Sequence, residues 1–285
     1  MAAGETLTGS EYVAHHLQNF ASGVQHRLFD ASIVNYDTLF FSVLTAAIFL
    51  LFLRWVATRS TSGVPGRLQA FVEMVVELVD EQAKTIVTVD RTYAAPLALT
   101  VFCWVTLMNA IDLLPVDLLP RIAHAIGSSH LRALPTADVN VPLGMAIAVL
   151  VLSLYYGIKV KGLFGFVRDL FAAPFGQVHL TVNPLTWLGM LLLGIANFGM
   201  NIIEYVSKTF SMGMRLFGNM YAGELLFMLL ALLGGTATLL GGLGHLFLGW
   251  AWSVFHILII LLQAFIFMML TLVYIGQAQE SHAGH

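Results

Sequence analysis

The chain has 285 residues, of which 58% are hydrophobic and 10% are charged, and its mean hydropathy is +0.84. This composition excludes a pair of ordinary soluble domains and is typical of a membrane protein. The formal net charge of -3, without a run of lysine or arginine, argues against a nucleic-acid partner. The single cysteine, Cys103, excludes an intrachain disulfide. We expect neither a cofactor nor a bound metal ion.

The first half of the sequence predicts a polar tail and three plain membrane spans. Residues 1–36 lack the basic start and apolar centre of a cleaved signal peptide, so we expect a retained extracytoplasmic tail. A helix needs about 20 apolar residues to cross the hydrocarbon core, which predicts spans at residues 38–56, 96–114 and 141–158. Residues 66–89 alternate apolar and acidic side chains at helical spacing, which predicts an amphipathic interfacial helix.

The second half contains two longer apolar stretches, residues 187–233 and 244–276. As one helix, the first stretch would be about 70 Å long, more than twice the thickness of the hydrocarbon core. It is therefore either two crossings with a turn near residues 207–211 or one strongly tilted helix, and the absence of proline favours the tilted helix. With five spans, residues 37–280 form one all-α membrane domain, followed by a short cytoplasmic tail at 281–285.

Basic residues predict the orientation, because loops on the cytoplasmic side carry the excess of lysine and arginine. Most of these residues flank the loop between the first two spans or follow the third span: Arg54, Arg59, Arg67, Lys84, Arg91, Lys159, Lys161 and Arg168. The N-terminal tail contains only Arg27, and the loop between the second and third spans only Arg121 and Arg132. We therefore expect the N-terminus outside the cytoplasm and the C-terminus inside it.

A polar stripe runs along the stretch 187–233, where an ionisable residue is costly and needs a partner. At about 100° per residue, seven polar side chains fall on one face over more than six turns. They are Asn197, Asn201, Glu204, Lys208, Ser211, Arg215 and Asn219. Glu224, nine residues after Arg215, lies on the opposite face. The stretch therefore presents two separate polar environments.

Structural alternatives for this stripe stay open. Glu204 and Lys208 are four residues apart in the favourable order, so they can simply neutralise each other. The asparagines can serve as hydrogen-bond links between helices. Arg215 lies in the middle of the stretch, which fits snorkelling to the interface poorly. Because arginine does not release a proton, we expect Arg215 to be a fixed positive charge that helps a passing carboxylate ionise and bars protons from crossing directly.

The last apolar stretch carries a second polar face, formed by His256, Gln263 and Tyr274. Histidine titrates near neutrality and can pass protons, although a lone histidine on an apolar helix is more often a structural residue. Glu224, across the hairpin, is the expected partner that favours a proton-transfer role for His256.

Several strings resemble subunit a of the F-type ATP synthase in its Gram-negative bacterial form. The most specific are MRLFGNMYAGEL at 214–225 and WSVFHILIILLQAFIFMMLTLVY at 252–274. The resemblance covers nearly the whole chain and includes NYDTLFFS (35–42), SGVPGRLQ (62–69), NAIDLLPVDLLP (109–120), PTADVNV (135–141) and IKVKG (158–162).

The resemblance implies a non-catalytic, proton-translocating stator subunit of the Fo motor, whose last two long, tilted helices embrace a ring of c subunits. Arg215 would face the ring carboxylates between two offset aqueous half-channels. Glu224 and His256 match outer half-channel residues, and Asn219 and Gln263 match polar residues near the arginine. Weaker candidates for channel lining, from the resemblance and the two polar faces, are Asp112, Asp117, Glu204, Lys208, Ser211 and Tyr274.

The same resemblance implies the partners and the location. The partners are the c-subunit ring, the b subunits of the peripheral stalk, the remaining synthase subunits and membrane lipid. The location is the bacterial inner membrane. Nucleotide chemistry would belong to other subunits, because the chain has no GxxxxGK[ST] loop.

Two other classes of function stay open at the level of the sequence. A self-contained secondary transporter would need its own substrate pocket, and the sequence has neither a fixed-period repeat nor paired interrupted helices. A purely structural membrane anchor predicts that Arg215 tolerates leucine, against which the polar stripe argues. Within the family, the choice between proton and sodium resides largely around the ring carboxylate, which belongs to another chain.

Overall fold

The computed structural model describes five long stretches of the chain, which are residues 33–87, 91–115, 132–172, 184–235 and 238–279. It also describes a short N-terminal segment, residues 19–23, and positions 13, 17 and 118. Within these residues every regular element is a helix, apart from one isolated antiparallel bridge between Ala21 and Asn35. Five of the helices are long and apolar enough to cross a membrane. The chain is therefore an all-α membrane protein, as predicted. Most of the predicted tail 1–36 and all of the tail 281–285 lie outside the described residues.

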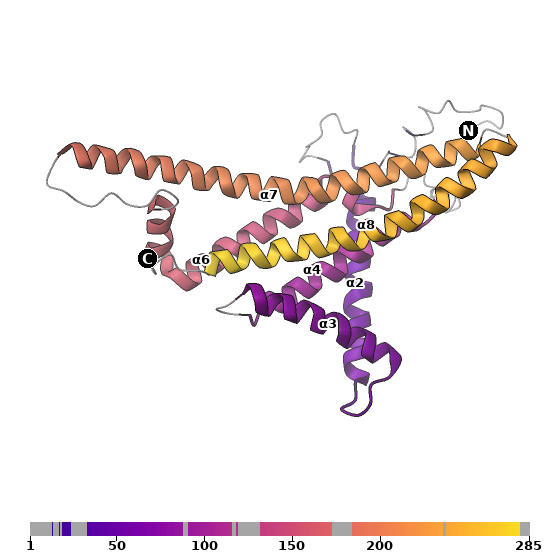
Figure 1. The fold of residues 1–285 in the computed structure, drawn as a ribbon, viewed down its shortest axis with the longest axis horizontal. Coiled ribbons are helices and arrows are strands. Elements are labelled where there is room, and N and C mark those ends of the chain that lie inside the picture. The colour runs from indigo at the N-terminus through magenta and orange to yellow at the C-terminus, as the bar shows by residue number, and fades with distance from the viewer. Residues whose placement is uncertain are drawn as a thin grey trace.

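The N-terminal helices are α2 (Tyr36–Arg59), α3 (Arg67–Ile86) and α4 (Ala94–Ala110). In Figure 1, α2 stands across the direction of the long C-terminal helices. α3 is amphipathic: Val79 and Ala83 are buried in a cluster with α4 and with α8 (Leu239–Gln279), and most of its acidic side chains are exposed. This arrangement is typical of a helix lying beside a bundle with its polar face in water.

The third candidate span belongs to α6 (Asn140–Ala172), which continues beyond the predicted residues 141–158. Its axis breaks at Gly162, whose φ of 73° lies in the left-handed region that glycine adopts without strain. A salt bridge of 3.2 Å between Lys161 Nζ and Asp169 Oδ2 joins the two sides of the break. A glycine at this position therefore turns the end of α6 towards the next helix.

The two long C-terminal helices form the body of the molecule. α7 (Pro184–Gly234) is a single continuous helix of 51 residues, so the prediction of one helix rather than two crossings is confirmed. α8 has 41 residues and follows α7 after a tight hairpin. Figure 1 shows the two helices together at the hairpin and separating towards their other ends, where α6 packs against α7.

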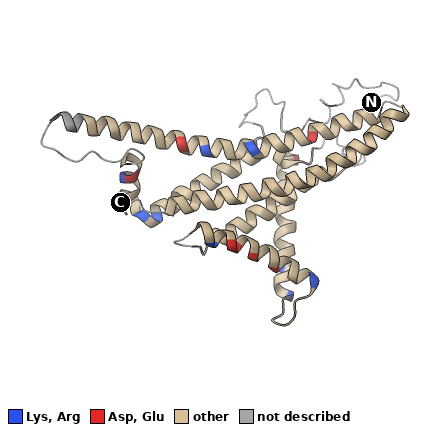
Figure 2. Cartoon of the chain, viewed as in Figure 1, with Lys and Arg blue, Asp and Glu red and all other residues tan. Residues whose placement is uncertain are grey.

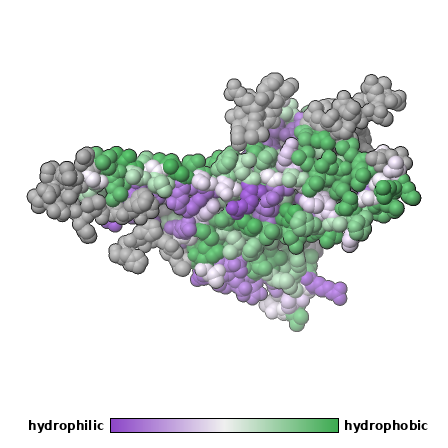
Figure 3. All heavy atoms as spheres, turned by 45° about the horizontal axis from the view of Figure 1, so that its top comes forward, coloured by the Kyte–Doolittle hydropathy of each residue, from purple (hydrophilic) through white to green (hydrophobic). Residues whose placement is uncertain are grey.

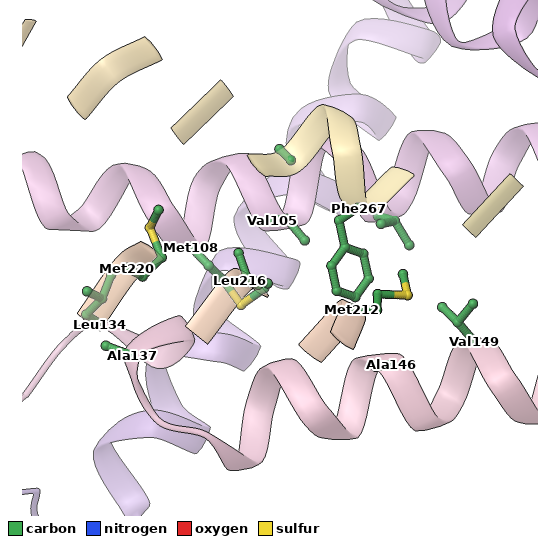
Figure 4. Packing of buried hydrophobic residues seen from close by; sticks show 12 residues of the cluster. Val105, Met108, Leu134, Ala137, Ala146, Val149, Met212, Leu216, Met220 and Phe267 are labelled. Atoms are coloured by element: carbon green, nitrogen blue, oxygen red, sulfur yellow. The ribbon is translucent and has the colours of Figure 1, made fainter. Parts of the chain in front are cut away.

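The main core lies where α4, α6, α7 and α8 meet the short helix η2 (Pro135–Ala137). Met212, Leu216 and Met220 project from one side of α7 at intervals of four residues, and all three are almost completely buried. Figure 4 shows them between α4, α6 and Phe267 of α8. Because side chains four residues apart lie on the same face of a helix, this ridge fixes the rotation of α7 about its axis.

Charged side chains are sparse on the long helices. Figure 2 shows a few acidic and basic positions on α7 and none along α8, which contains no Asp, Glu, Lys or Arg. On the face drawn in Figure 3, apolar side chains cover most of the surface and a hydrophilic band crosses its middle. An apolar surface of this extent is expected where lipid takes the place of water.

Candidate functional site

Arg215 lies near the middle of α7 on the side that the rest of the chain leaves uncovered. Its neighbours on that face, Ser211, Gly218 and Ala222, are small and exposed, while Leu216 on the adjoining face is buried. Within the described part of the chain, no carboxylate forms an ion pair with Arg215. The helix therefore presents an uncompensated positive charge on an apolar surface.

The other residues predicted to lie near Arg215 are divided between two helices. Asn219 donates its Nδ2–H to the carbonyl oxygen of Arg215, 3.0 Å away, so its amide is turned back onto its own helix. On α8, the centroid of the Tyr274 ring lies 5.5 Å from Nζ of Lys208, a residue of the same polar stripe as Arg215. Gln263 is buried on the packed side of α8. The structure therefore brings Asn219 to Arg215, Tyr274 to Lys208 and Gln263 into the inside of the bundle.

His256 lies on the buried face of α8, and its side chain has 0% exposure. Its Nε2 is 2.7 Å from Oδ2 of Asp112, which belongs to the short helix η1 (Ile111–Leu113) at the end of α4. The two atoms are within ion-pair distance, although their alignment is poor for a hydrogen bond. Protonation of the imidazole would give an ion pair between two groups that are both shielded from solvent.

The position of the His256 ring is determined by its packing. A Cβ atom at Gly223 would lie only 2.3 Å from Cε1 of the ring, so α7 can approach this closely only with glycine there. The centroids of the Phe227 and Trp252 rings lie 5.2 and 5.8 Å from that of the imidazole. A glycine, two aromatic rings and a carboxylate thus hold His256 in one place.

Glu224 continues the buried ridge of α7, four residues after Met220. Its carboxylate accepts two hydrogen bonds from Arg132, one of 3.0 Å from Nε to Oε1 and one of 2.5 Å from Nη2 to Oε2. The exposed fractions of the two side chains are 9% for Arg132 and 11% for Glu224. Burial by itself lowers the pKa of Arg132, but the Glu224 carboxylate, with smaller contributions from Asp138 and Tyr221, offsets this and raises that pKa above its ordinary value.

Arg132 begins a buried segment, residues 132–139, that we call the strap. Its backbone N–H donates to Oδ2 of Asp37 at the start of α2, and its Nη2 also donates to the Ala137 carbonyl oxygen. At the other end of the strap, Asp138 accepts a hydrogen bond of 2.7 Å from Asn35 Nδ2. The strap therefore ties the beginning of α2 to the carboxylate of α7.

Two further polar side chains are enclosed near the strap and η1. Asn109 and Thr136 have 0% exposure, and their side-chain polar atoms have no hydrogen-bond partner within the described residues. Buried polar groups are normally satisfied, so this concentration is unusual for a purely structural core. It marks the hairpin end of the bundle as a polar interior.

The ion pairs differ from the sequence-based expectation. Glu224 was the expected partner of His256, but the carboxylate at His256 is that of Asp112, and Glu224 pairs with Arg132. The physical reason is that Gly223 rather than Glu224 faces the imidazole, since successive residues of a helix point about 100° apart. Sequence reasoning treated Arg132 only as a loop charge. Asp117 lies outside the described residues.

At the opposite end, the stripe of α7 makes structural contacts. Lys208 Nζ is 2.5 Å from Oε1 of Glu204 and donates a 3.0 Å hydrogen bond to Gln277 of α8. Asn197 donates to the Phe171 carbonyl oxygen, and Asn201 donates to that of Leu170, each over 2.9 Å. These are the bonds that the structural alternatives for the lysine pair and for both asparagines require, and they leave a further role in transport as a prediction. The stripe therefore divides into a bonded half and an exposed half that contains Ser211 and Arg215.

Comparison with known proteins supports one family. The sequence model described as "ATP synthase A chain" matches residues 39–276. A protein named ATP synthase subunit a from Acidovorax sp. (strain JS42) is 54% identical over 96% of this chain and 97% of its own length. Proteins with that name from Paracidovorax citrulli (strain AAC00-1) and Verminephrobacter eiseniae (strain EF01-2) are 51% and 50% identical, each over 99% of both chains.

These matches extend over the helices that carry Arg215, Glu224, Asp112 and His256. They confirm the resemblance that the sequence motifs indicated. The chain therefore belongs to the ATP synthase A chain family.

Proposed function

We propose that this chain is the proton-conducting stator subunit of an Fo motor, coupling proton flow to rotation of a c-subunit ring and to ATP synthesis. One observation carries the proposal: Arg215 is an exposed positive charge on an apolar surface, without an ion-pair partner in the described chain. A charge within the bilayer needs a counter-charge. The relatives are named as subunits of ATP synthase, so the counter-charge is expected on another subunit.

The face around Arg215 suits a moving partner. Ser211, Gly218 and Ala222 leave the backbone of α7 accessible, and small residues allow membrane helices to approach closely. A Cβ atom added at Gly218 would have no atom of the described chain within 4 Å. A ring of helices, each with one carboxylate, could pass this face and meet the guanidinium in turn.

The outer half-path would run through the polar interior at the hairpin end. A proton entering there passes the His256–Asp112 pair, beside the anionic Glu224, and is transferred to a ring carboxylate. Once neutral, that carboxyl group can rotate into lipid at a much lower free-energy cost than the anion. After nearly a full turn it releases the proton into the inner half-path, for which Glu204, Lys208 and Tyr274 are lining candidates.

Arg215 would then act as the barrier between the two half-paths. The arginine attracts the deprotonated ring carboxylate, favours its ionised form and does not carry a proton itself. One charge that moves through 100 mV releases about 2.3 kcal/mol, so the free energy released by several protons must be combined to make each ATP. Rotation of the ring performs that combination. This chain would have no catalytic site of its own.

The proposed location is the bacterial inner membrane, with the N-terminus and the hairpin end outside and the C-terminus in the cytoplasm. The support is the excess of basic residues beside α3 and after the third span. The c ring, the b subunits of the peripheral stalk and the other synthase subunits are the proposed partners. Independence of ATP-driven pumping from sodium would support the proton over sodium as the ion.

The test replaces Arg215 by alanine in the assembled synthase. We expect R215A to abolish ATP-driven proton pumping while the complex still assembles, because the exposed side chain forms no ion pair with the described residues. R168A is the matched control, since Arg168 is an exposed arginine of α6 outside the site. Normal coupled pumping by R215A would contradict the proposal.

A further inference from the structure

The feature not explained by this function is Arg132, a nearly buried arginine outside the membrane helices. Its guanidinium donates to Glu224, its backbone N–H donates to Asp37, and Asp138 belongs to the same strap, while Asp112 faces the neighbouring His256. In the described part of the chain, no salt bridge joins Asp37 or Asp138 to a lysine or to another arginine, and Asp112 lies within ion-pair distance of His256. Arg132 is therefore a fixed positive charge in an acidic, shielded region.

The strap has anchors besides the side chain of Arg132, whose Nη2 also donates to the Ala137 carbonyl oxygen. Leu134 and Ala137 anchor the strap in the main core, and Asp138 is bonded to Asn35. The bond to Asp37 comes from the backbone N–H of Arg132, which any residue except proline would supply. The guanidinium makes its two-bonded contact with Glu224 in addition to these links. Its geometry is that of a fork fitted to both oxygens of one carboxylate.

We propose that Arg132 is a positioning residue of the outer half-path, which holds Glu224 as a carboxylate in a fixed place beside the His256–Asp112 pair. This inference rests on the proposed function of that half-path. With both its oxygens engaged, Glu224 serves as a stationary negative charge near the proton route. The proton then passes along the neighbouring pair of His256 and Asp112, whose atoms lie 2.7 Å apart.

Loss of the guanidinium would change the site electrically more than sterically. Glu224 would lose the donor that engages both of its oxygens in a shielded region, and it would take up a proton or turn away from its present position. In either case the stationary charge disappears. A lysine at the same position would keep the charge but offers a point donor in place of the planar fork.

The experiment compares variants of the complete ATP synthase in inverted membrane vesicles. The variants are R132Q, R132K, E224Q and the double variant R132Q/E224Q, with K84Q as a control that removes a positive charge from the exposed Lys84–Asp80 pair on α3. Two readouts are taken: ATP-driven proton pumping, and passive proton conduction after removal of the soluble sector. Both are normalised to the amount of this chain in the membrane, which separates conduction from assembly.

We expect R132Q to lower proton conduction about tenfold, which is the lower end of the loss seen when a residue that orients a metal ligand is removed. R132K should retain more conduction than R132Q, and K84Q should conduct like the wild type. The double variant should conduct no worse than E224Q alone, because residues that act through one another are not additive. If R132Q fails to accumulate, R132K and R132K/E224Q provide the same comparison.

Three results separate the possible failures. Wild-type conduction in R132Q overturns the positioning role. Multiplied losses in the double variant show that Arg132 acts independently of Glu224 and also overturn it. Wild-type conduction in E224Q would instead contradict the proposed function of Glu224, whatever Arg132 does.

Discussion

Two arginines have opposite environments at helix α7: Arg132 contacts the helix from the strap, and Arg215 belongs to the helix itself. Arg132 is nearly buried and grips Glu224 through two hydrogen bonds, whereas Arg215 stands on an uncovered face of α7 with no ion pair in the described chain. The first charge is satisfied within the chain and is best understood as part of its internal architecture. The second has no ion-pair partner among the described residues, which supports the proposal that its counter-charge lies on another subunit. The missing partner, more than the residue type, indicates the intermolecular function.

The largest expected effect of a substitution is on the free energy of unfolding, which should fall when Arg132 is replaced and not when Arg215 is replaced. Removing one member of a buried ion pair typically costs about 3–5 kcal/mol, since the remaining charge is left shielded and unpaired. We therefore expect R132L to lower the free energy of unfolding of the chain by that amount, and R215L to leave it nearly unchanged. Thermal unfolding of the detergent-solubilised chain measures both. Equal destabilisation by the two variants would break the comparison.

A smaller effect is expected from two glycines of α7. G223A would place a methyl group against the buried His256 ring, and overpacking of this kind typically costs about 1–3 kcal/mol. G218A, on the face of Arg215, meets no atom of the described chain and should lose no stability. The same unfolding assay distinguishes them. A G223A variant as stable as the wild type would show that the packing around His256 is looser than described.

Much of the fold follows from local properties of the sequence. The absence of proline from the stretch after Pro184 and its length predicted the single helix α7, and the acidic and apolar alternation predicted α3. The angular count also placed Glu224 away from Arg215. The ridge of Met212, Leu216 and Met220 has the same four-residue spacing that leads to Glu224, so the burial of Glu224 has a signal in the sequence.

The pairing of charges could not be predicted in the same way. Arg132 and Glu224 are 92 residues apart in the sequence, and their contact depends on how the strap packs against α7. Likewise, nothing local to Asn197 indicates that it bonds to the Phe171 carbonyl, because that contact requires the break of α6 at Gly162. Side-chain periodicity shows which residues share a face, but the packing of other helices determines which face is covered.

The central claim is that the uncovered face of α7 around Arg215 meets the ring subunit. The most direct measurement is cross-linking in assembled synthase in which Cys103 is replaced by alanine and a single cysteine is introduced into α7. S211C, on the exposed face, should cross-link to a cysteine placed beside the ring carboxylate, and T209C, at a buried position, should not. Cross-linking from T209C but not from S211C would contradict the account.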